Sequence, residues 1–144
     1  MTPFRLLLRV RYGECDAQQV VFNARYGDYV DVAATEFYRA VFGSYQSLLE
    51  QNLDSQVVRM AIDWSAPARF DDVLQLEVST LRLGNSSFAL EVDIRRQTDQ
   101  AAIARAEVTY VMVDAKAFSK TAIPEAIRVQ LEHGAPGVTV NQAG

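Results

Sequence analysis

The 144-residue chain contains a single cysteine, Cys15, and a single histidine, His133. A lone cysteine excludes a disulfide within the chain, and one cysteine with one histidine cannot supply the ligands of a usual structural zinc site. The sequence also lacks a Gly-x-Ser-x-Gly elbow, a glycine-rich phosphate loop and a dinucleotide-binding fingerprint. We therefore expect no metal, no cofactor and no serine or cysteine nucleophile activated by histidine.

Long apolar runs and an excess of positive charge are absent as well. The apolar runs are only a few residues long, far below the roughly 20 residues that cross a bilayer, and the formal net charge is −4. These features predict a protein that neither spans a membrane nor binds nucleic acid through a basic surface. The first residues enter an alternating strand pattern without the pattern of a signal sequence, so we expect a cytoplasmic protein.

A chain of this length fits one domain, which we place at residues 1–144 with a flexible tail from about residue 134. Alternation of apolar and polar residues predicts five strands, at residues 4–12, 56–64, 73–81, 87–97 and 102–113. In the first strand we expect Phe4, Leu6 and Tyr12 on one face. Gly84-Asn85 predicts a hairpin turn between the third and fourth strands, and Pro124 predicts the start of a short helix.

One stretch follows the helical period instead. Apolar side chains recur at the spacing of one helix face, at Tyr26, Tyr29, Val30, Ala33, Ala34, Phe37, Tyr38 and Val41. We predict that Asn23 caps the start of this helix and that Gly43 ends it, with one further helical turn near Leu48-Leu49. The order of elements predicts an α+β fold in which an antiparallel sheet of about five strands wraps around one long helix.

A carboxylate precedes this helix. Asp16 closes the first predicted strand, and the helix N-terminus presents unpaired backbone N–H groups and a partial positive charge. A carboxylate that faces a helix N-terminus predicts a candidate active site. The structural alternative is that Asp16 only accepts a hydrogen bond from an amide of its own loop, as aspartates in turns often do.

Several segments together resemble a known family. They are the acidic pair Glu14-Cys15-Asp16, the loop Val20-Val21-Phe22-Asn23, the helix entry Ala24-Arg25-Tyr26, the strand end Ile62-Asp63-Trp64-Ser65-Ala66-Pro67-Ala68, the turn Gly84-Asn85-Ser86-Ser87 and the helix opening Ile123-Pro124. In this order, over nearly the whole chain, they resemble the hotdog-fold acyl-CoA thioesterases of the 4-hydroxybenzoyl-CoA thioesterase type. One position departs from the family pattern, because Gln19 replaces a loop glycine.

The resemblance implies that the protein hydrolyses an acyl-CoA thioester to the free acid and coenzyme A. It implies that Asp16 acts as general base or nucleophile and that the backbone N–H of Asn23 polarises the thioester carbonyl. The residues that it implies in substrate binding are Gln19, Val21, Phe22, Tyr26, Ser86 and Ser87. We expect Tyr26 mainly in the core, given its place on the apolar helix face, and Glu14 as a solvated charge at the strand end.

The family likeness also implies a homodimer or homotetramer with a continuous sheet and with sites between subunits, which would cover an otherwise unpaired edge strand. The lone histidine, far from the helix, argues against the hotdog dehydratases. Candidates for the coenzyme A phosphates are Arg82, Arg95, Arg96 and Lys116, although scattered surface charges usually have no such role. The alternative function is a non-catalytic hotdog protein that binds acyl groups or only assembles, with a site altered by Gln19.

Overall fold

The computed structural model describes residues 2–144. Six strands form one sheet in the order β2-β5-β4-β3-β1-β6. Neighbouring strands are antiparallel, except that β6 runs parallel to β1. The strands are β1 (Phe4–Arg9), β2 (Leu53–Trp64), β3 (Val73–Leu83), β4 (Ser87–Arg96), β5 (Ala102–Asp114) and β6 (Thr139–Gln142), and the helices are α1 (Arg25–Phe42), α2 (Gln46–Glu50) and α3 (Glu125–His133).

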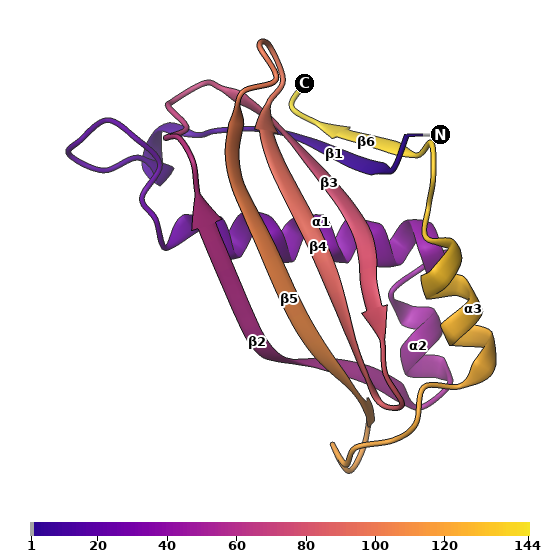
Figure 1. Cartoon of the computed structure of the whole chain (residues 1–144). Coiled ribbons are helices and arrows are strands. Elements are labelled where there is room, and N and C mark those ends of the chain that lie inside the picture. The colour runs from indigo at the N-terminus through magenta and orange to yellow at the C-terminus, as the bar shows by residue number, and fades with distance from the viewer. Residues whose placement is uncertain (1) are drawn as a thin grey trace.

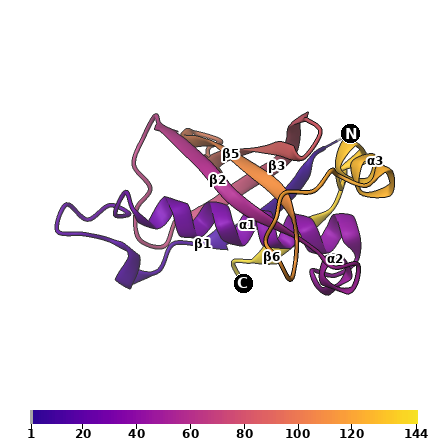
Figure 2. The ribbon, with the colours of Figure 1, turned by 90° about the horizontal axis from the view of Figure 1, so that it is seen from below.

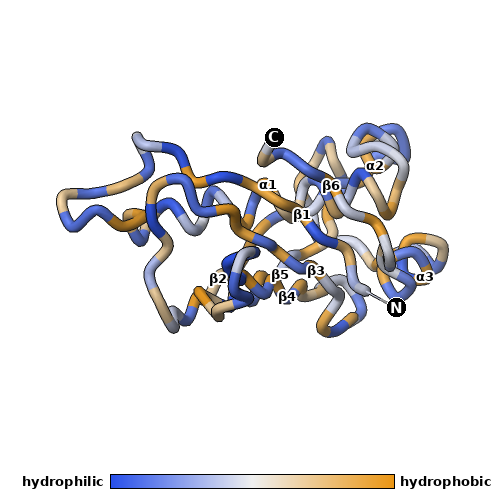
Figure 3. The backbone as a smooth tube through the Cα atoms, turned by 90° about the horizontal axis from the view of Figure 1, so that it is seen from above, coloured by the Kyte–Doolittle hydropathy of each residue, from blue (hydrophilic) through white to orange (hydrophobic). Residues whose placement is uncertain are grey.

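Helix α1 lies across one face of the sheet (Figure 1), and the sheet bends around it when seen along the layer (Figure 2). Hydrophobic and hydrophilic residues alternate along the strands (Figure 3), so that one side of the sheet packs on the helix. The core therefore joins the helix face at Val30, Ala33 and Phe37 to strand residues such as Leu76 and Leu90, all of them buried. This is the predicted hotdog fold.

The predicted helix is confirmed, whereas its predicted cap is not. Gly43 ends α1 in the left-handed region, with a φ of 84°. At the start, Ala24 occupies the cap position in a helical conformation and no side chain caps the helix. The chain enters α1 through a turn in which the Tyr26 N–H donates to the carbonyl of Asn23 over 3.3 Å. Asn23 therefore lies just before the helix and contributes its backbone rather than its side chain.

The hairpin and the extra helical turn are also confirmed. Between β3 and β4 the N–H of Gly84 donates to the carbonyl of Ser87 over 2.7 Å. A Cβ at Gly84 would approach the Ser87 hydroxyl to 2.9 Å, which explains the glycine at this turn. Helix α2 is the turn predicted around Leu48-Leu49.

The strands differ from the sequence prediction at the two ends of the chain. The tail expected from residue 134 contains β6, which pairs with β1 and makes six strands where we expected about five. The first strand ends at Arg9 because a 3-10 turn follows at Tyr12–Glu14, and this turn leaves Tyr12 81% exposed instead of in the core. Among residues 2–144, no helix is long and apolar enough to cross a membrane.

Candidate active site

Asp16 lies in a loop that is held against the segment following β2. The N–H of Asp16 donates to the carbonyl of Val20 over 2.9 Å, and the N–H of Val21 donates to the carbonyl of Ala68 over 2.8 Å. Val20 also forms a β-bridge with Arg69. Residues distant in sequence therefore fix the place of this carboxylate.

The Asp16 side chain stabilises its own loop. One carboxylate oxygen, Oδ1, accepts a hydrogen bond from the N–H of Gln18 over 2.8 Å, which is the structural role considered as an alternative. The other oxygen accepts no hydrogen bond from residues 2–144, and the side chain is only half-buried. Asp16 can thus hold the loop with one oxygen and present the other to a ligand.

Two cavities of about 590 Å³ each meet at Asp16, and it is the residue that both share. The first, here called the Arg69 cavity, is also lined by Tyr12, Cys15, Gln19, Arg69 and Phe70. The second, here called the Trp64 cavity, lies between the helix entry and the end of β2, and its lining includes Val21, Phe22, Asn23, Tyr26 and Trp64. A ligand bound across Asp16 can therefore extend in two directions.

The predicted donor lies in the Trp64 cavity. The backbone N–H of Asn23 donates to no acceptor within residues 2–144. The N–H of the preceding residue, Phe22, by contrast donates to the carbonyl of Glu14 over 2.9 Å. Both Asn23 and Asp16 line this cavity. A residue with an unused backbone N–H and a residue with a carboxylate thus line one cavity.

The aromatic residue of the helix entry, Tyr26, is buried as its place on the helix face predicted. Its ring packs edge-on against Tyr29 and Trp64, with centroids 5.8 Å and 5.7 Å away. Its hydroxyl accepts a hydrogen bond from the N–H of Ala68 over 3.4 Å, and burial is the main cause that raises its pKa. Tyr26 therefore supports the Trp64 cavity as a wall.

Gln19, where the family has a glycine, adopts a φ of 65°. This left-handed conformation costs little for glycine and more for other residues, which accounts physically for the family's glycine. The exposed side chain of Gln19 lines the Arg69 cavity. The glutamine thus keeps the loop conformation and adds a polar side chain to one cavity.

Two predicted binding residues are distant from Asp16 within one chain. Ser86 and Ser87 lie at the turn between β3 and β4, at the opposite end of the sheet from the Asp16 loop (Figure 1). Ser86 is buried and its carbonyl accepts the N–H of Met112 over 2.7 Å. A single subunit therefore does not bring these serines to the carboxylate.

The other acidic residue of the motif, Glu14, is not the solvated charge that we expected. It is only 7% exposed, and its carboxylate accepts hydrogen bonds from the backbone N–H and guanidinium of Arg11 and from the hydroxyl of Tyr29. Burial favours the neutral acid, but these hydrogen bonds outweigh it and lower the pKa of Glu14. Glu14 therefore ties the start of the loop to α1.

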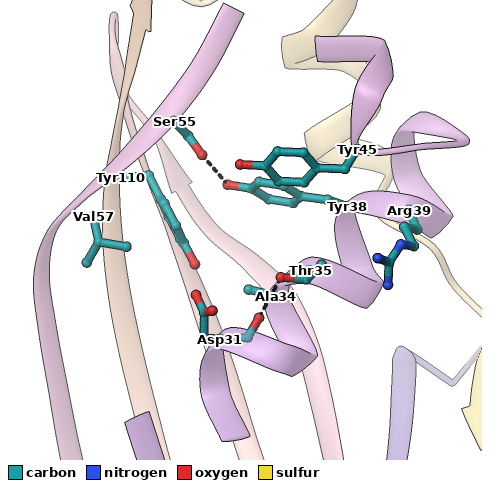
Figure 4. Close-up of a pocket in the computed structure, with 9 residues that line it drawn as sticks. All are labelled: Asp31, Ala34, Thr35, Tyr38, Arg39, Tyr45, Ser55, Val57 and Tyr110. Atoms are coloured by element: carbon teal, nitrogen blue, oxygen red, sulfur yellow. Dashed lines mark hydrogen bonds between the residues drawn. The ribbon is translucent and has the colours of Figure 1, made fainter. Parts of the chain in front are cut away.

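A further cavity, of about 370 Å³, was not predicted. It lies between α1 and the strands β2 and β5, and its lining includes Tyr38, Tyr45, Ser55 and Tyr110 (Figure 4). The Tyr38 hydroxyl lies 3.0 Å from the Ser55 hydroxyl, and its ring stacks on Tyr45. Sequence patterns assign Tyr38 and Tyr110 simply to the core, because periodicity does not reveal a gap between packed elements.

Comparisons with known proteins agree on one family. Residues 10–131 match the model of the thioesterase-like superfamily. This chain belongs to that superfamily. It is 30% identical over 131 residues to the acyl-CoA thioesterase YbgC of Haemophilus influenzae, covering 90% of this chain and 95% of that protein. It is 27% identical over 125 residues to the long-chain acyl-CoA thioesterase FadM of Escherichia coli, covering 87% and 94%.

Solved structures support the same assignment. The crystal structure of YbaW, a probable thioesterase from Escherichia coli, superimposes with a TM-score of 0.79 and 26% identity over 91% of this chain and 98% of that chain. A thioesterase superfamily protein from Jannaschia sp. CCS1 gives a TM-score of 0.85 at 22% identity, over 94% of each chain, which bears on the fold alone. The hotdog assignment is confirmed, and the protein is a thioester hydrolase by family.

Proposed function

We propose that this protein hydrolyses acyl-CoA thioesters and that Asp16 is its catalytic carboxylate. The observation that carries the proposal is the position of Asp16 where two cavities meet, with the unused N–H of Asn23 in one of them. The names of the relatives YbgC and FadM supply the substrate class. The non-catalytic alternative is disfavoured by this family membership.

In the proposed reaction the thioester carbon lies beside Asp16, and the acyl and pantetheine arms leave through different cavities. The carbonyl oxygen accepts the Asn23 N–H, which stabilises the negative charge that develops on it. The start of α1, two residues later, adds its partial positive charge. Asp16 either takes a proton from a water that attacks the carbonyl carbon, or attacks this carbon itself to form an acyl anhydride that water then hydrolyses. In both cases the C–S bond breaks, and coenzyme A leaves as the thiolate.

We further propose that the site is completed by a second copy of the chain. The sheet ends at β2, whose outer edge has no strand partner among residues 2–144. If two copies pair antiparallel through β2 about a two-fold axis, each end of one copy's sheet lies on the same side as the opposite end of the partner's sheet. The partner's hairpin turn between β3 and β4 then reaches the end that carries Asp16. This arrangement would give Ser86 and Ser87 their expected role in substrate binding. We also propose a cytoplasmic location.

The test is Asp16→Asn. The asparagine oxygen can still accept the N–H of Gln18, so the loop should keep its conformation while the base is lost. We expect kcat on a panel of acyl-CoAs, measured by thiol release, to fall by about 10²–10⁴-fold. Circular dichroism and the urea midpoint should remain close to those of the parent protein.

Asp28→Asn is the matched control. Asp28 is an exposed carboxylate on the first turn of α1 that lines neither the Arg69 cavity nor the Trp64 cavity. Its substitution should leave kcat within about twofold, since an exposed ion pair contributes little. If Asp16→Asn lost stability and activity together, Asp16 would be a structural residue and another base would have to be sought.

A further inference from the structure

One arginine beside Asp16 differs from the others. Within residues 2–144, Arg69 is the arginine whose guanidinium makes neither a hydrogen bond nor an ion pair. The arginines suggested above for phosphate binding are all occupied, with Arg82 bound to Glu107, Arg95 to Asp93, and Arg96 to Asp72 and Asp99. An arginine without a partner among residues 2–144 thus lines one of the two cavities that meet at Asp16.

Two of the residues that line the Arg69 cavity beside Arg69 are aromatic. Tyr12 and Phe70 pack edge-to-face with ring centroids 5.8 Å apart, and both are exposed to solvent. Exposed aromatic rings beside a cation suit a ligand with an apolar stem and an anionic end. Phe70 directly follows Arg69 in the chain, so the ring and the guanidinium come from one short segment.

The negative charges near Arg69 are already engaged. The carboxylate of Asp72 accepts the backbone N–H of Arg69 and pairs with Arg96, and Asp71 pairs with Arg9. The carboxylate that remains in the cavity is Asp16 itself. An anionic group on the substrate would be repelled by Asp16, and Arg69 is placed to compensate that repulsion.

The distance between the two residues limits which anion can bind. The two residues are held close to each other, because the N–H of Asp16 donates to the carbonyl of Val20 and Val20 forms a β-bridge with Arg69. Both residues line one cavity, so a short acyl chain, such as one of about three to five carbons, can reach from the thioester at Asp16 to an anion bound by Arg69. The pantetheine arm separates the thioester from the coenzyme A phosphates by about 15 Å when extended, so a cation in the same cavity as the thioester suits an anion on the acyl group better than these phosphates.

We infer that the Arg69 cavity is the acyl subsite and that it selects short acyl groups that end in a carboxylate. This inference rests on the proposed function. The methylene groups of such an acyl chain lie against Tyr12 and Phe70, and its terminal carboxylate binds Arg69. Pantetheine then leaves through the Trp64 cavity.

The experiment compares acyl groups of equal length with and without the charge. The probes are glutaryl-CoA and valeryl-CoA, together with the N-acetylcysteamine thioesters of the same two acids, which carry no phosphate. We expect the parent protein to prefer the glutaryl thioesters. Arg69→Gln should lower kcat/KM for both glutaryl thioesters by about 10–100-fold, the effect of one charge-assisted hydrogen bond, and Arg69→Lys should restore part of this loss.

Valeryl thioesters provide the internal control, because their hydrolysis should change by less than about threefold in Arg69→Gln, as expected for a lost surface charge. Arg105→Gln removes the same charge from the outer face of the sheet, where Arg105 pairs with Glu91, and should change neither substrate. Equal losses on both CoA thioesters, with none on the N-acetylcysteamine thioesters, would mean that Arg69 binds a phosphate and would overturn the inference.

Absence of a glutaryl preference in the parent protein would also overturn it, while valeryl-CoA hydrolysis that depends on Asp16 would leave the proposed function intact. If no thioester in the panel were hydrolysed, or if Asp16→Asn retained full activity, the proposed function itself would fail. The two failures therefore give different results.

Discussion

At the scale of single residues, Gln19 combines a backbone that favours glycine with a side chain in the Arg69 cavity. The left-handed conformation costs about 1–2 kcal/mol for a residue with a Cβ. A glycine at this position would remove that cost, while its greater freedom in the unfolded chain would cost about 0.5–1 kcal/mol. The difference favours glycine by about 0–1.5 kcal/mol, so stability does not account for the glutamine, and Gln19 is best explained by what its side chain does.

We predict that Gln19→Gly raises kcat/KM for bulkier acyl-CoAs and raises the free energy of unfolding by no more than about 1.5 kcal/mol. Steady-state kinetics on one short, one long and one aromatic acyl-CoA, together with urea unfolding, measure both effects. Gln97→Gly is the matched control, because Gln97 is exposed, lines neither cavity and has no positive φ to relieve, so this variant should only lose stability.

An unchanged substrate profile for Gln19→Gly would mean that Gln19 does not shape the site. Loss of an activity that the parent protein has would instead identify the Gln19 amide as a donor to the ligand or to the attacking water. Each result is separate from a change in stability, which the unfolding measurement reports independently.

The site residues differ in how far the sequence reveals them. Asp16, Asn23 and Gln19 follow from a local motif of consecutive residues, and the structure places them around one loop. Arg69 and Phe70 could not be found in this way, because only the long-range bridge between Val20 and Arg69 brings them to Asp16. A pairing between two irregular segments has no periodicity to detect.

At the scale of elements, the loop that carries Asp16 depends on Glu14. Its carboxylate joins the N–H of Arg11, before the loop, to the hydroxyl of Tyr29 on α1. Its main-chain carbonyl accepts the N–H of Phe22, after the loop. One buried residue therefore fixes both ends of the loop relative to the helix.

We predict that Glu14→Gln lowers the free energy of unfolding by about 1–3 kcal/mol at pH 7, since a charged and hydrogen-bonded acceptor is replaced by a neutral amide. The folded-state pKa of Glu14 lies below its usual value of 4.5. Its contribution is therefore complete above about pH 4.5 and is lost as the pH falls through the lower folded-state pKa. The difference between parent and variant should shrink on acidification.

Urea unfolding at several values between pH 3 and pH 7 checks this prediction. Glu50→Gln, at an exposed position that ends α2, is the control and should show no such pH-dependent difference. A difference between parent and Glu14→Gln that stayed constant over this range would show that ionisation of Glu14 does not contribute to stability.

Elements with a clear period were predictable, and those without one were not. Helix α1 and the strands β3, β4 and β5 bury one face each, so their apolar spacing identifies them, and β2 shows the same alternation although most of it is exposed. Strand β6 is a four-residue edge strand that buries little, and its pairing with β1 is set by the contact between chain segments far apart in sequence. The early end of β1 was missed because Tyr12 continues the alternation although the chain has turned into a 3-10 helix.

At the scale of the whole molecule, the two edges of the sheet are unlike. The β6 edge is a strand of four residues, whereas β2 has twelve and exposes large apolar side chains, among them Val57 (49%), Val58 (58%) and Trp64 (49%). The ladder to β5 shifts between Val57 and Arg59, so Val58 forms a bulge. A long apolar edge is a surface that proteins normally cover, and a second copy of β2 is self-complementary under a two-fold axis.

We predict that the parent protein is at least a dimer by light scattering at micromolar concentration, and that the double variant Val57→Lys, Val58→Lys is mainly monomeric. Each lysine would place an unpaired charge in an apolar interface, and every 1.4 kcal/mol of that cost weakens association about tenfold. Val129→Lys, at an exposed position of α3, should leave the mass of the assembly unchanged.

The monomeric variant should also lose activity while keeping its fold, because the Ser86–Ser87 turn would no longer reach Asp16 of the partner. A parent protein that is monomeric and active would contradict the shared site, and a variant that stays dimeric would place the interface away from β2.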